Sequence, residues 1–215
     1  MKMSKVQLQQ EFRRQTKTLI DKGYHIEAGI TENELLRILT LLEEKLYSHS
    51  VEVPDLEIGY LPFVLVVKNS FVSTAKAMEL VKRHDKKGIT KLFPHTPKDF
   101  KVAFDIDIPK SNVYLLADID RGKDNINLAP IEAIELIKNS KRTPLTIDEG
   151  VAIITQFPNF LMKNNCFSLL ASRTGKDKRV PAIWINQKRE PNLGWCWDGN
   201  PHTWLGSASC RIRLS

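Results

Sequence analysis

The chain has 215 residues, which is enough for one sizeable domain. Hydrophobic residues make up 42% and charged residues 27%, which excludes a wholly disordered chain, and no apolar run approaches the roughly 18–20 residues that span a bilayer. Lys and Arg (32) exceed Asp and Glu (25) by seven, a balance that suits polyanionic partners but also occurs in proteins that merely expose many lysines.

Cysteine usage and the opening residues bear on location. The three cysteines are an odd number with no close pair, which is typical of a reducing compartment. The first residues contain no apolar segment of the kind found in secretory signals. We therefore expect a cytoplasmic protein with no membrane partner.

The first fifty residues predict two helices. Apolar residues recur at helical spacing over residues 6–20, and Gly23 follows as a helix stop. Thr31 and Glu34 form a capping-box pattern at the start of the second helix. The apolar stripe of this helix pair must pack against another part of the protein to be shielded from water. We therefore expect residues 1–50 to pack on an α/β core formed by residues 60–215, within a single domain spanning 1–215.

The middle of the chain predicts strands and helices in alternation. Short apolar runs predict strands over 61–67, 113–118, 166–170 and 180–186. Helices are expected over 73–83, over 130–137 and from Thr146, where Glu149 completes a second capping box, to Pro158. Residues 88–110 lack periodicity and read as a loop. The predicted fold class is α+β, with mixed α/β as the alternative: one mixed sheet of about five strands, packed by helices.

The tail from Leu193 to Leu214 predicts a hairpin around Asp198–Pro201. With a two-residue loop, Trp197 would face His202 and Trp195 would face Trp204, giving an aromatic wall. With a three-residue loop, Asp198 would instead face His202, a carboxylate–imidazole pair that could orient the histidine. Pro201 has no N–H for the ladder, so the register stays open.

The tail is also the richest patch for chemistry. Its aromatic, acidic and imidazole side chains read either as a hydrophobic cluster or as a ligand pocket with polar groups at its rim. The candidate catalytic residues are Glu149, Asp198, His202 and Cys196. The candidate ligand-binding residues are Arg142, Trp195, Trp197, Trp204 and Arg173. Gly150, inside a helix, predicts the close approach of another segment or of a ligand.

Metal and polyanion sites have weaker sequence support. Cys196, His202 and Cys210 do not have the spacing of a common zinc signature, so we predict no metal site. The identity of any cofactor stays open. Two basic segments, 81–91 and 173–191, leave nucleic-acid binding as an alternative.

Five strings carry a resemblance: LPFVLVV (61–67), YLLADIDRG (114–122), RTPLTIDEG (142–150), VPAIWI (180–185) and LGWCWDGNPHTWLG (193–206). They resemble a bacterial family of proteins of unknown function, domain of unknown function 5701, over roughly Gln15 to Arg211. The resemblance implies a bacterial, single-domain, cytoplasmic protein. It implies no activity and no catalytic residues.

Taken together, the residues favour a small-molecule-binding protein with a Trp-lined pocket, either a pure binder or an enzyme whose reaction the sequence does not name. The alternatives are a structural or protein-interaction domain without chemistry and a basic protein that binds nucleic acid or another polyanion. The sequence leaves the oligomeric state open.

Overall fold

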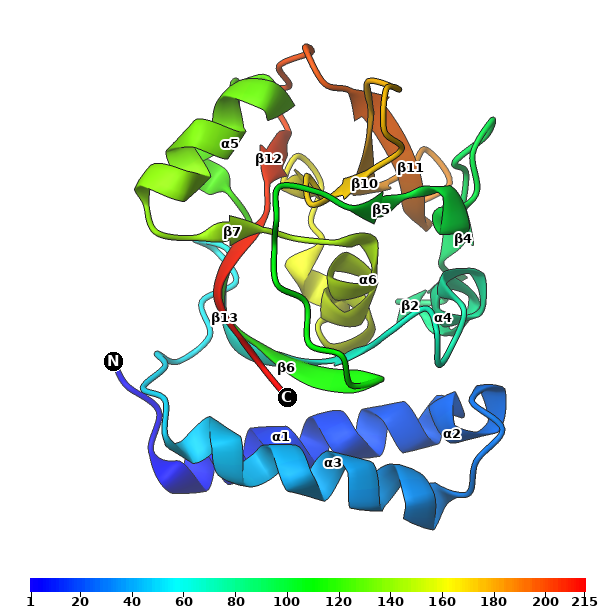
Figure 1. The fold of residues 1–215 in the computed structure, drawn as a ribbon, viewed down its shortest axis with the longest axis vertical. Coiled ribbons are helices and arrows are strands. Elements are labelled where there is room, and N and C mark those ends of the chain that lie inside the picture. Colours follow the sequence, from blue (N-terminus) through cyan, green and yellow to red (C-terminus); the bar gives the residue numbers. More distant parts are fainter.

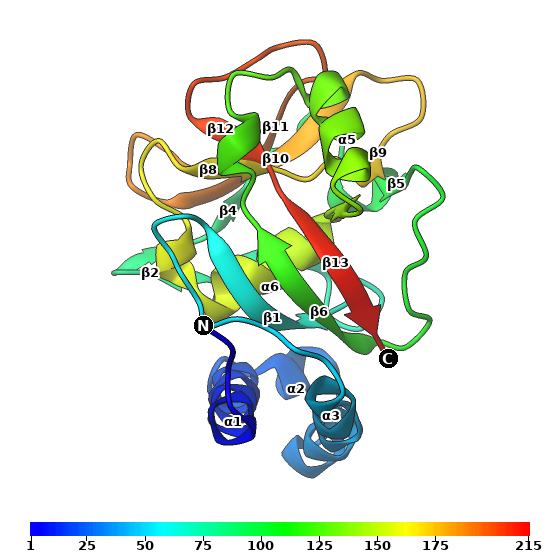
Figure 2. The ribbon, with the colours of Figure 1, turned by 90° about the vertical axis from the view of Figure 1, so that its left-hand side faces the viewer.

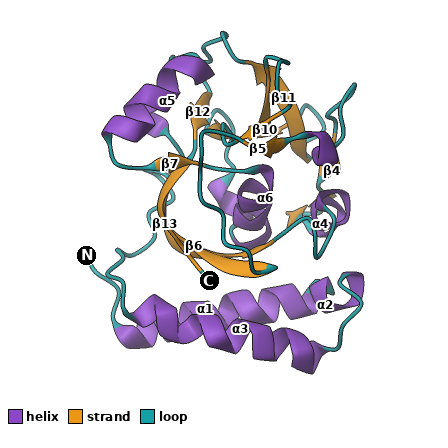
Figure 3. Ribbon diagram, in the orientation of Figure 1, coloured by secondary structure: helices purple, strands orange, loops and turns teal.

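The computed structural model describes residues 1–215 and has an α+β fold (Figure 1, Figure 3). The α-helices are α1 (Lys5–Asp21), α2 (Tyr24–Glu27), α3 (Glu32–Tyr47), α4 (Thr74–Leu80), α5 (Pro130–Asn139) and α6 (Ile147–Gln156). Three short 3-10 helices are η1 (Pro97–Asp99), η2 (Lys123–Asn125) and η3 (Pro158–Phe160).

Two main sheets form the core. The first is antiparallel, with the order β1-β6-β13-β7, and contains β1 (Tyr60–Val67), β6 (Val113–Asp120), β13 (Ser209–Leu214) and β7 (Thr143–Pro144). The second is mixed, with the order β12-β8-β10-β11-β4, and contains β12 (Leu205–Ser207), β8 (Cys166–Ser168), β10 (Arg179–Ile185), β11 (Pro191–Trp197) and β4 (Ile89–Thr90). Two small pairs complete the strands: β2 (Lys82–Arg83) with β3 (Lys86–Lys87), and β5 (Lys101–Val102) with β9 (Ser172–Arg173).

Helix α6 lies between the two sheets (Figure 1). It contacts β1 in the first sheet and β10 in the second, and all of its residues except Asp148 are buried. Its N-terminus is closed by the predicted capping box: Thr146 Oγ1 accepts from the Glu149 amide at 3.4 Å, and Glu149 Oε2 accepts from the Thr146 amide at 2.7 Å. A helix that is apolar on nearly every side is the kind that can be buried between two layers.

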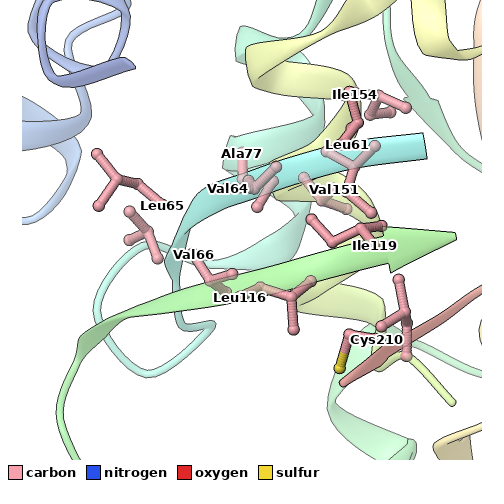
Figure 4. Packing of buried hydrophobic residues seen from close by; sticks show 14 of the residues in the cluster. Leu61, Val64, Leu65, Val66, Ala77, Leu116, Ile119, Val151, Ile154 and Cys210 are labelled. Carbon is pink, nitrogen blue, oxygen red and sulfur yellow. The ribbon is translucent and has the colours of Figure 1, made fainter. Parts of the chain in front are cut away.

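One apolar cluster joins the N-terminal helices, α4 and α6 to both sheets, whereas the buried residues of α5 form a smaller second cluster. Figure 4 shows its centre, where Leu61 and Val64 of β1 and Ile119 of β6 meet Val151 and Ile154 of α6. Strand β1 is buried on both faces, as the continuous apolar run predicted, because α6 covers one face and the N-terminal helices cover the other.

The N-terminal helices form the predicted pair beneath the first sheet (Figure 2). The capping box of α3 is present: Glu34 Oε2 accepts from the Thr31 amide at 2.7 Å, and Thr31 Oγ1 accepts from the Glu34 amide at 3.2 Å. Gln15 of α1 is fully buried and reaches the edge strand β1. Its Nε2 donates to the Phe63 carbonyl at 3.0 Å, and its Oε1 accepts from the Leu65 amide at 2.8 Å.

The predicted α+β class, with its five-stranded mixed sheet and N-terminal helical pair, is confirmed. The first sheet, with four strands, is an addition that the sequence did not predict. The predicted tail hairpin is wrong. β11 pairs with β10 and β4, β12 runs parallel to β8, and β13 joins the other sheet. The tail does form strands, but they do not pair with one another: β11 pairs with the preceding strand β10, and β12 and β13 pair with strands distant in sequence.

None of the helices is both long enough and apolar enough to cross a membrane.

Candidate functional site

Glu149, a candidate catalytic residue, is completely buried and fully hydrogen-bonded. Arg213 of β13 donates to both of its carboxylate oxygens, at 2.6 and 3.0 Å, and the Tyr114 hydroxyl of β6 donates at 2.9 Å. Burial and then the charge of Glu149 raise the pKa of Tyr114 well above its usual value. With the capping bond to Thr146, every acceptor position of this carboxylate is used. Glu149 therefore ties the first sheet to α6.

Gly150 is explained by a neighbouring segment. A Cβ on this residue would stand 2.5 Å from Cδ2 of Leu169, so the absence of a side chain lets the second sheet approach α6 closely. This is the first of the two explanations that the sequence offered.

A polar cavity of about 310 Å³ lies beside the start of α6. Its wall includes Asp148, Tyr114, Ser172 and Lys68. Burial raises the pKa of Asp148, although Asp148 accepts hydrogen bonds from the Asn69 amide at 2.9 Å and from Thr74 Oγ1 at 3.2 Å. These bonds tie the Asp148 carboxylate to the loop after β1 and to the start of α4, so both of its oxygens already have partners.

The two arginines among the candidate ligand-binding residues are already paired with carboxylates. Arg142 donates to Asp118 at 2.8 Å and to Ser209 Oγ at 2.8 Å. Arg173 donates to Asp198 at 2.8 Å, and both side chains of that pair are less than one-fifth exposed. Asp198 thus faces an arginine rather than His202, and the predicted carboxylate–imidazole pair does not form.

Cys196 and His202 are also separated. Burial raises the pKa of the Cys196 thiol to about 11, which keeps it protonated near neutral pH. Its charged neighbours are Arg173 and Asp198. His202 lies against Trp204, with ring centroids 5.2 Å apart, and burial lowers its pKa. No hydrogen bond or ion pair links His202 to Cys196, Asp198 or Glu149, so these four residues do not form one catalytic group.

The tryptophans form two separate pairs. Trp195 and Trp197 share one face of β11, with ring centroids 5.1 Å apart. Trp204 instead meets Trp184 at 6.4 Å. Trp197 pairs in register with Arg179 of β10 and not with His202. The predicted single wall of Trp195, Trp197 and Trp204 is therefore replaced by two pairs.

Arg179 stacks on the first pair. Its guanidinium carbon lies 4.5 Å from the Trp195 ring centroid and 4.8 Å from that of Trp197. Arg179 also pairs with Asp177, which accepts a 3.0 Å hydrogen bond from His95. The bond from His95, followed by those from Arg179, lowers the pKa of Asp177. The aromatic pair is thus braced by an ionic chain on the surface of the second sheet.

An open hollow of about 630 Å³ adjoins this aromatic pair. Two indoles, one from each pair, contribute to it, together with the segment that follows β4. The residues that line it are Thr90, Lys91, Leu92, Phe93, His95, Thr96, Pro97, Trp184 and Trp195. The Trp195 indole is fixed by a hydrogen bond from its Nε1 to the Phe93 carbonyl at 2.9 Å.

The hollow lies at a free edge of the second sheet. The last ladder bond from β4 to β11 runs from the Lys91 amide to the Leu193 carbonyl, at 2.7 Å. Trp195 pairs with Pro181 of β10. Proline has no N–H, and the Pro181 carbonyl accepts a hydrogen bond from the Leu169 amide, on the side of β10 that faces away from β11. In an antiparallel pair of this kind the backbone groups of both residues point away from each other. The Trp195 N–H and C=O therefore face the side of the hollow, as one donor and one acceptor.

The sequence predicted one member of this site, Trp195, because aromatic, acidic and imidazole side chains are concentrated in the tail. It missed the segment from Lys91 to Pro97, because a loop without periodicity says nothing about what it packs against. Trp184, which also lines the hollow, was not among the predicted site residues. The signal that could have marked Trp184 is its position in a strand that the sequence did predict.

Comparison with known proteins identifies a family whose function is not known. A family model described as a family of unknown function (DUF5701) matches residues 18–215. No curated protein matches the chain. No solved structure matches it either.

Proposed function

The chain belongs to DUF5701, a family of unknown function, so we propose a function from the site itself: binding of a small planar ligand in the hollow between Trp184 and Trp195. The observation that carries the proposal is that two indoles wall one open hollow at a free sheet edge. Aromatic walls with a few directed polar groups are typical of small-molecule sites.

The polar groups around the hollow define the chemistry of the ligand. The backbone of Trp195 offers one donor and one acceptor to a heteroaromatic edge. Lys91 is exposed and has no ion-pair partner, and His95 lines the same hollow. These groups favour a ligand that combines a flat ring with a negative charge. Nothing among them is an activated nucleophile, so we propose binding and assign no reaction.

The test is a ligand panel read by tryptophan fluorescence and thermal shift. Planar anions, including nucleotides, flavins and aromatic carboxylates, are titrated into wild type, Trp195→Ala and Trp197→Ala. A bound planar ligand is expected to quench fluorescence. Loss of one stacking face costs about 1–3 kcal/mol, so Trp195→Ala should weaken binding roughly 5- to 150-fold.

Trp197→Ala is the matched control, because Trp197 is 43% exposed and does not line the hollow. Its affinity should stay within a few-fold of wild type. A panel in which no compound changes the fluorescence or the melting temperature would reject the proposal. Equal affinities for wild type and Trp195→Ala would reject it as well.

A second candidate, binding of single-stranded nucleic acid, is favoured by the stack of Arg179 on Trp195 and Trp197. Exposed aromatic rings with basic neighbours are typical of such surfaces, and Phe93 nearby is 86% exposed. The net charge of +7 is of the right sign. This candidate requires affinity for an oligonucleotide that falls steeply with salt, whereas affinity for mononucleotides alone supports the first.

We also infer a cytoplasmic location in a bacterium. The support is the presence of three free cysteines, Cys166, Cys196 and Cys210, which suits a reducing compartment, together with the bacterial family that the sequence resembles.

A further inference from the structure

The cavity beside the start of α6 has a basic wall. Three lysines line it: Lys68 directly after β1, Lys98 in η1 and Lys101 in β5. None of the three forms an ion pair. The wall contains one acidic residue, Asp148, so three positive charges and one negative charge leave it with a net charge of +2. A concave surface of this sign attracts anions.

Two buried hydroxyls in the same wall can each donate one more hydrogen bond. Thr146 is 6% exposed and Ser172 is 5% exposed. Each hydroxyl oxygen accepts from a backbone amide of α6: Thr146 Oγ1 from Glu149 at 3.4 Å, and Ser172 Oγ from Ile147 at 2.9 Å. Neither hydroxyl donates to an atom of the protein. Because a hydroxyl carries one donor as well as its acceptors, both O–H groups suit a ligand that accepts hydrogen bonds.

The capping box of α3 shows why the Thr146 proton is unused. In that box the hydroxyl of Thr31 donates to the carboxylate of Glu34, at 2.8 Å. In α6 the corresponding carboxylate, Glu149, is bound on both oxygens by Arg213. The Thr146 hydroxyl makes no bond to it and keeps its donor for the cavity.

We propose that this cavity binds the phosphate group of a small phosphorylated molecule. The site is separate from the aromatic hollow and does not depend on the function proposed for it. A phosphate carries two negative charges near neutral pH and several acceptor oxygens, which match the unpaired lysines and the two hydroxyls. The N-terminus of α6 adds a partial positive charge at the same wall. A volume of about 310 Å³ leaves room for a small organic group beside the phosphate.

Asp148 is the one group in the wall that opposes an anion. Its oxygens accept from the Asn69 amide and from Thr74 Oγ1, so they are held by the segment that leads into α4. Removal of its charge should therefore strengthen phosphate binding. A site that used Asp148 to hold a cation or an amine would show the opposite effect.

The experiment measures binding of inorganic phosphate, glucose 6-phosphate and glucose to the full chain by isothermal titration calorimetry at constant ionic strength. Both phosphates should bind, and glucose should not. Equal affinities for the two phosphates would show that the phosphate group alone is recognised, whereas tighter binding of glucose 6-phosphate would show that the cavity also contacts the organic part. The inference is overturned if neither phosphate binds.

A pair of exposed lysines separates this site from general attraction to a basic protein. The double variant Lys98→Gln/Lys101→Gln should weaken phosphate binding roughly tenfold or more, because two charge-assisted contacts are lost. The matched control, Lys86→Gln/Lys87→Gln, removes the same charge from the exposed strand β3 and should stay within about twofold of wild type. Equal losses in the two double variants would overturn the inference.

Two further variants test the buried wall. Ser172→Ala should weaken phosphate binding by roughly fivefold or more, because one hydrogen bond to a charged ligand is lost, and Asp148→Asn should strengthen it. Unchanged affinity in folded Ser172→Ala, or weaker binding in Asp148→Asn, would count against the site. If Ser172→Ala does not fold, the exposed lysine pair and Asp148→Asn still decide.

Discussion

At the scale of single residues, several side chains that suggested chemistry hold the protein together instead. Glu149 is the clearest case. An acidic residue at the start of a helix, beside a glycine, fits a catalytic acid as well as a helix cap. In the structure it caps α6 and binds Arg213, whose side chain is only 7% exposed. A buried carboxylate with four hydrogen bonds is a structural link, because no acceptor position remains for a substrate.

Substitution of Glu149 should therefore act on stability. Glu149→Ala leaves the Arg213 charge buried without a partner, a situation that costs about 3–5 kcal/mol. Urea denaturation measures the loss. The control is Glu79→Ala, which removes an exposed pair with Lys76 (N–O 3.5 Å) and should cost no more than about 1 kcal/mol. Equal losses in the two variants would contradict the assignment.

His202 gives a pH dependence with a definite sign. Burial lowers its pKa in the folded state, whereas the unfolded chain titrates near about 6.5. The unfolded state therefore binds the proton first as the pH falls. The stability contributed by the neutral imidazole is complete above the unfolded pKa and is lost as the pH drops through it toward the folded pKa.

Melting curves between pH 8 and pH 5 test this sign. His202→Phe keeps a ring against Trp204 but cannot titrate, so its melting temperature should fall less than that of wild type as the pH is lowered. His84→Asn, which removes an exposed histidine, should follow the wild-type curve. Parallel curves for wild type and His202→Phe would show that His202 does not contribute.

At the scale of elements, helix α1 completes the edge of a sheet. Strand β1 is the outer strand of the first sheet, and Gln15 supplies its Leu65 amide and Phe63 carbonyl with the partners that a neighbouring strand would provide. Gln15 is fully buried. An edge covered in this way is closed to pairing with another molecule.

Gln15→Ala should therefore destabilise the protein and make it prone to aggregate. Each buried backbone group left without a partner costs about 1–3 kcal/mol. Denaturation measures the stability, and light scattering on mild heating measures the aggregation. Gln10→Ala, at an exposed position of the same helix, is the control and should resemble wild type. A soluble Gln15→Ala protein of wild-type stability would disprove the role of the side chain.

The elements also show how far the sequence could predict the fold. Helix starts were predictable because a capping box is local: Thr31 with Glu34, and Thr146 with Glu149, satisfy each other within one turn. Strand pairing was not. Alternation in the tail indicated which residues share a face, but β12 pairs with β8 and β13 pairs with β6, and no local pattern specifies a distant partner.

The candidate site was predictable only in part for the same reason. Trp195 stands out in the sequence because it lies close to two other tryptophans, Trp197 and Trp204. Lys91 and His95 enter the hollow through the fold alone, since β4 runs parallel to β11 and delivers the loop that follows it.

At the scale of the whole molecule, four layers follow one another: the N-terminal helices, the first sheet, α6 and the second sheet (Figure 1, Figure 2). The second sheet carries both the aromatic hollow and the Arg179 stack. The Glu149–Arg213 pair and Gln15 lie in the interior, on the first sheet. This division separates the residues of the hollow from those that secure the core, so substitutions in the hollow can alter binding with little effect on stability.

The order of the first sheet, β1-β6-β13-β7, also constrains how the protein is made. Its interior strand β13 is the last strand in the chain, and it separates β6 from β7. During synthesis β6 therefore emerges from the ribosome with one side bare, and the sheet cannot close until residue 214 is free. Until then one edge of the apolar strand β6 has no partner strand and is open to chaperones and to other nascent chains.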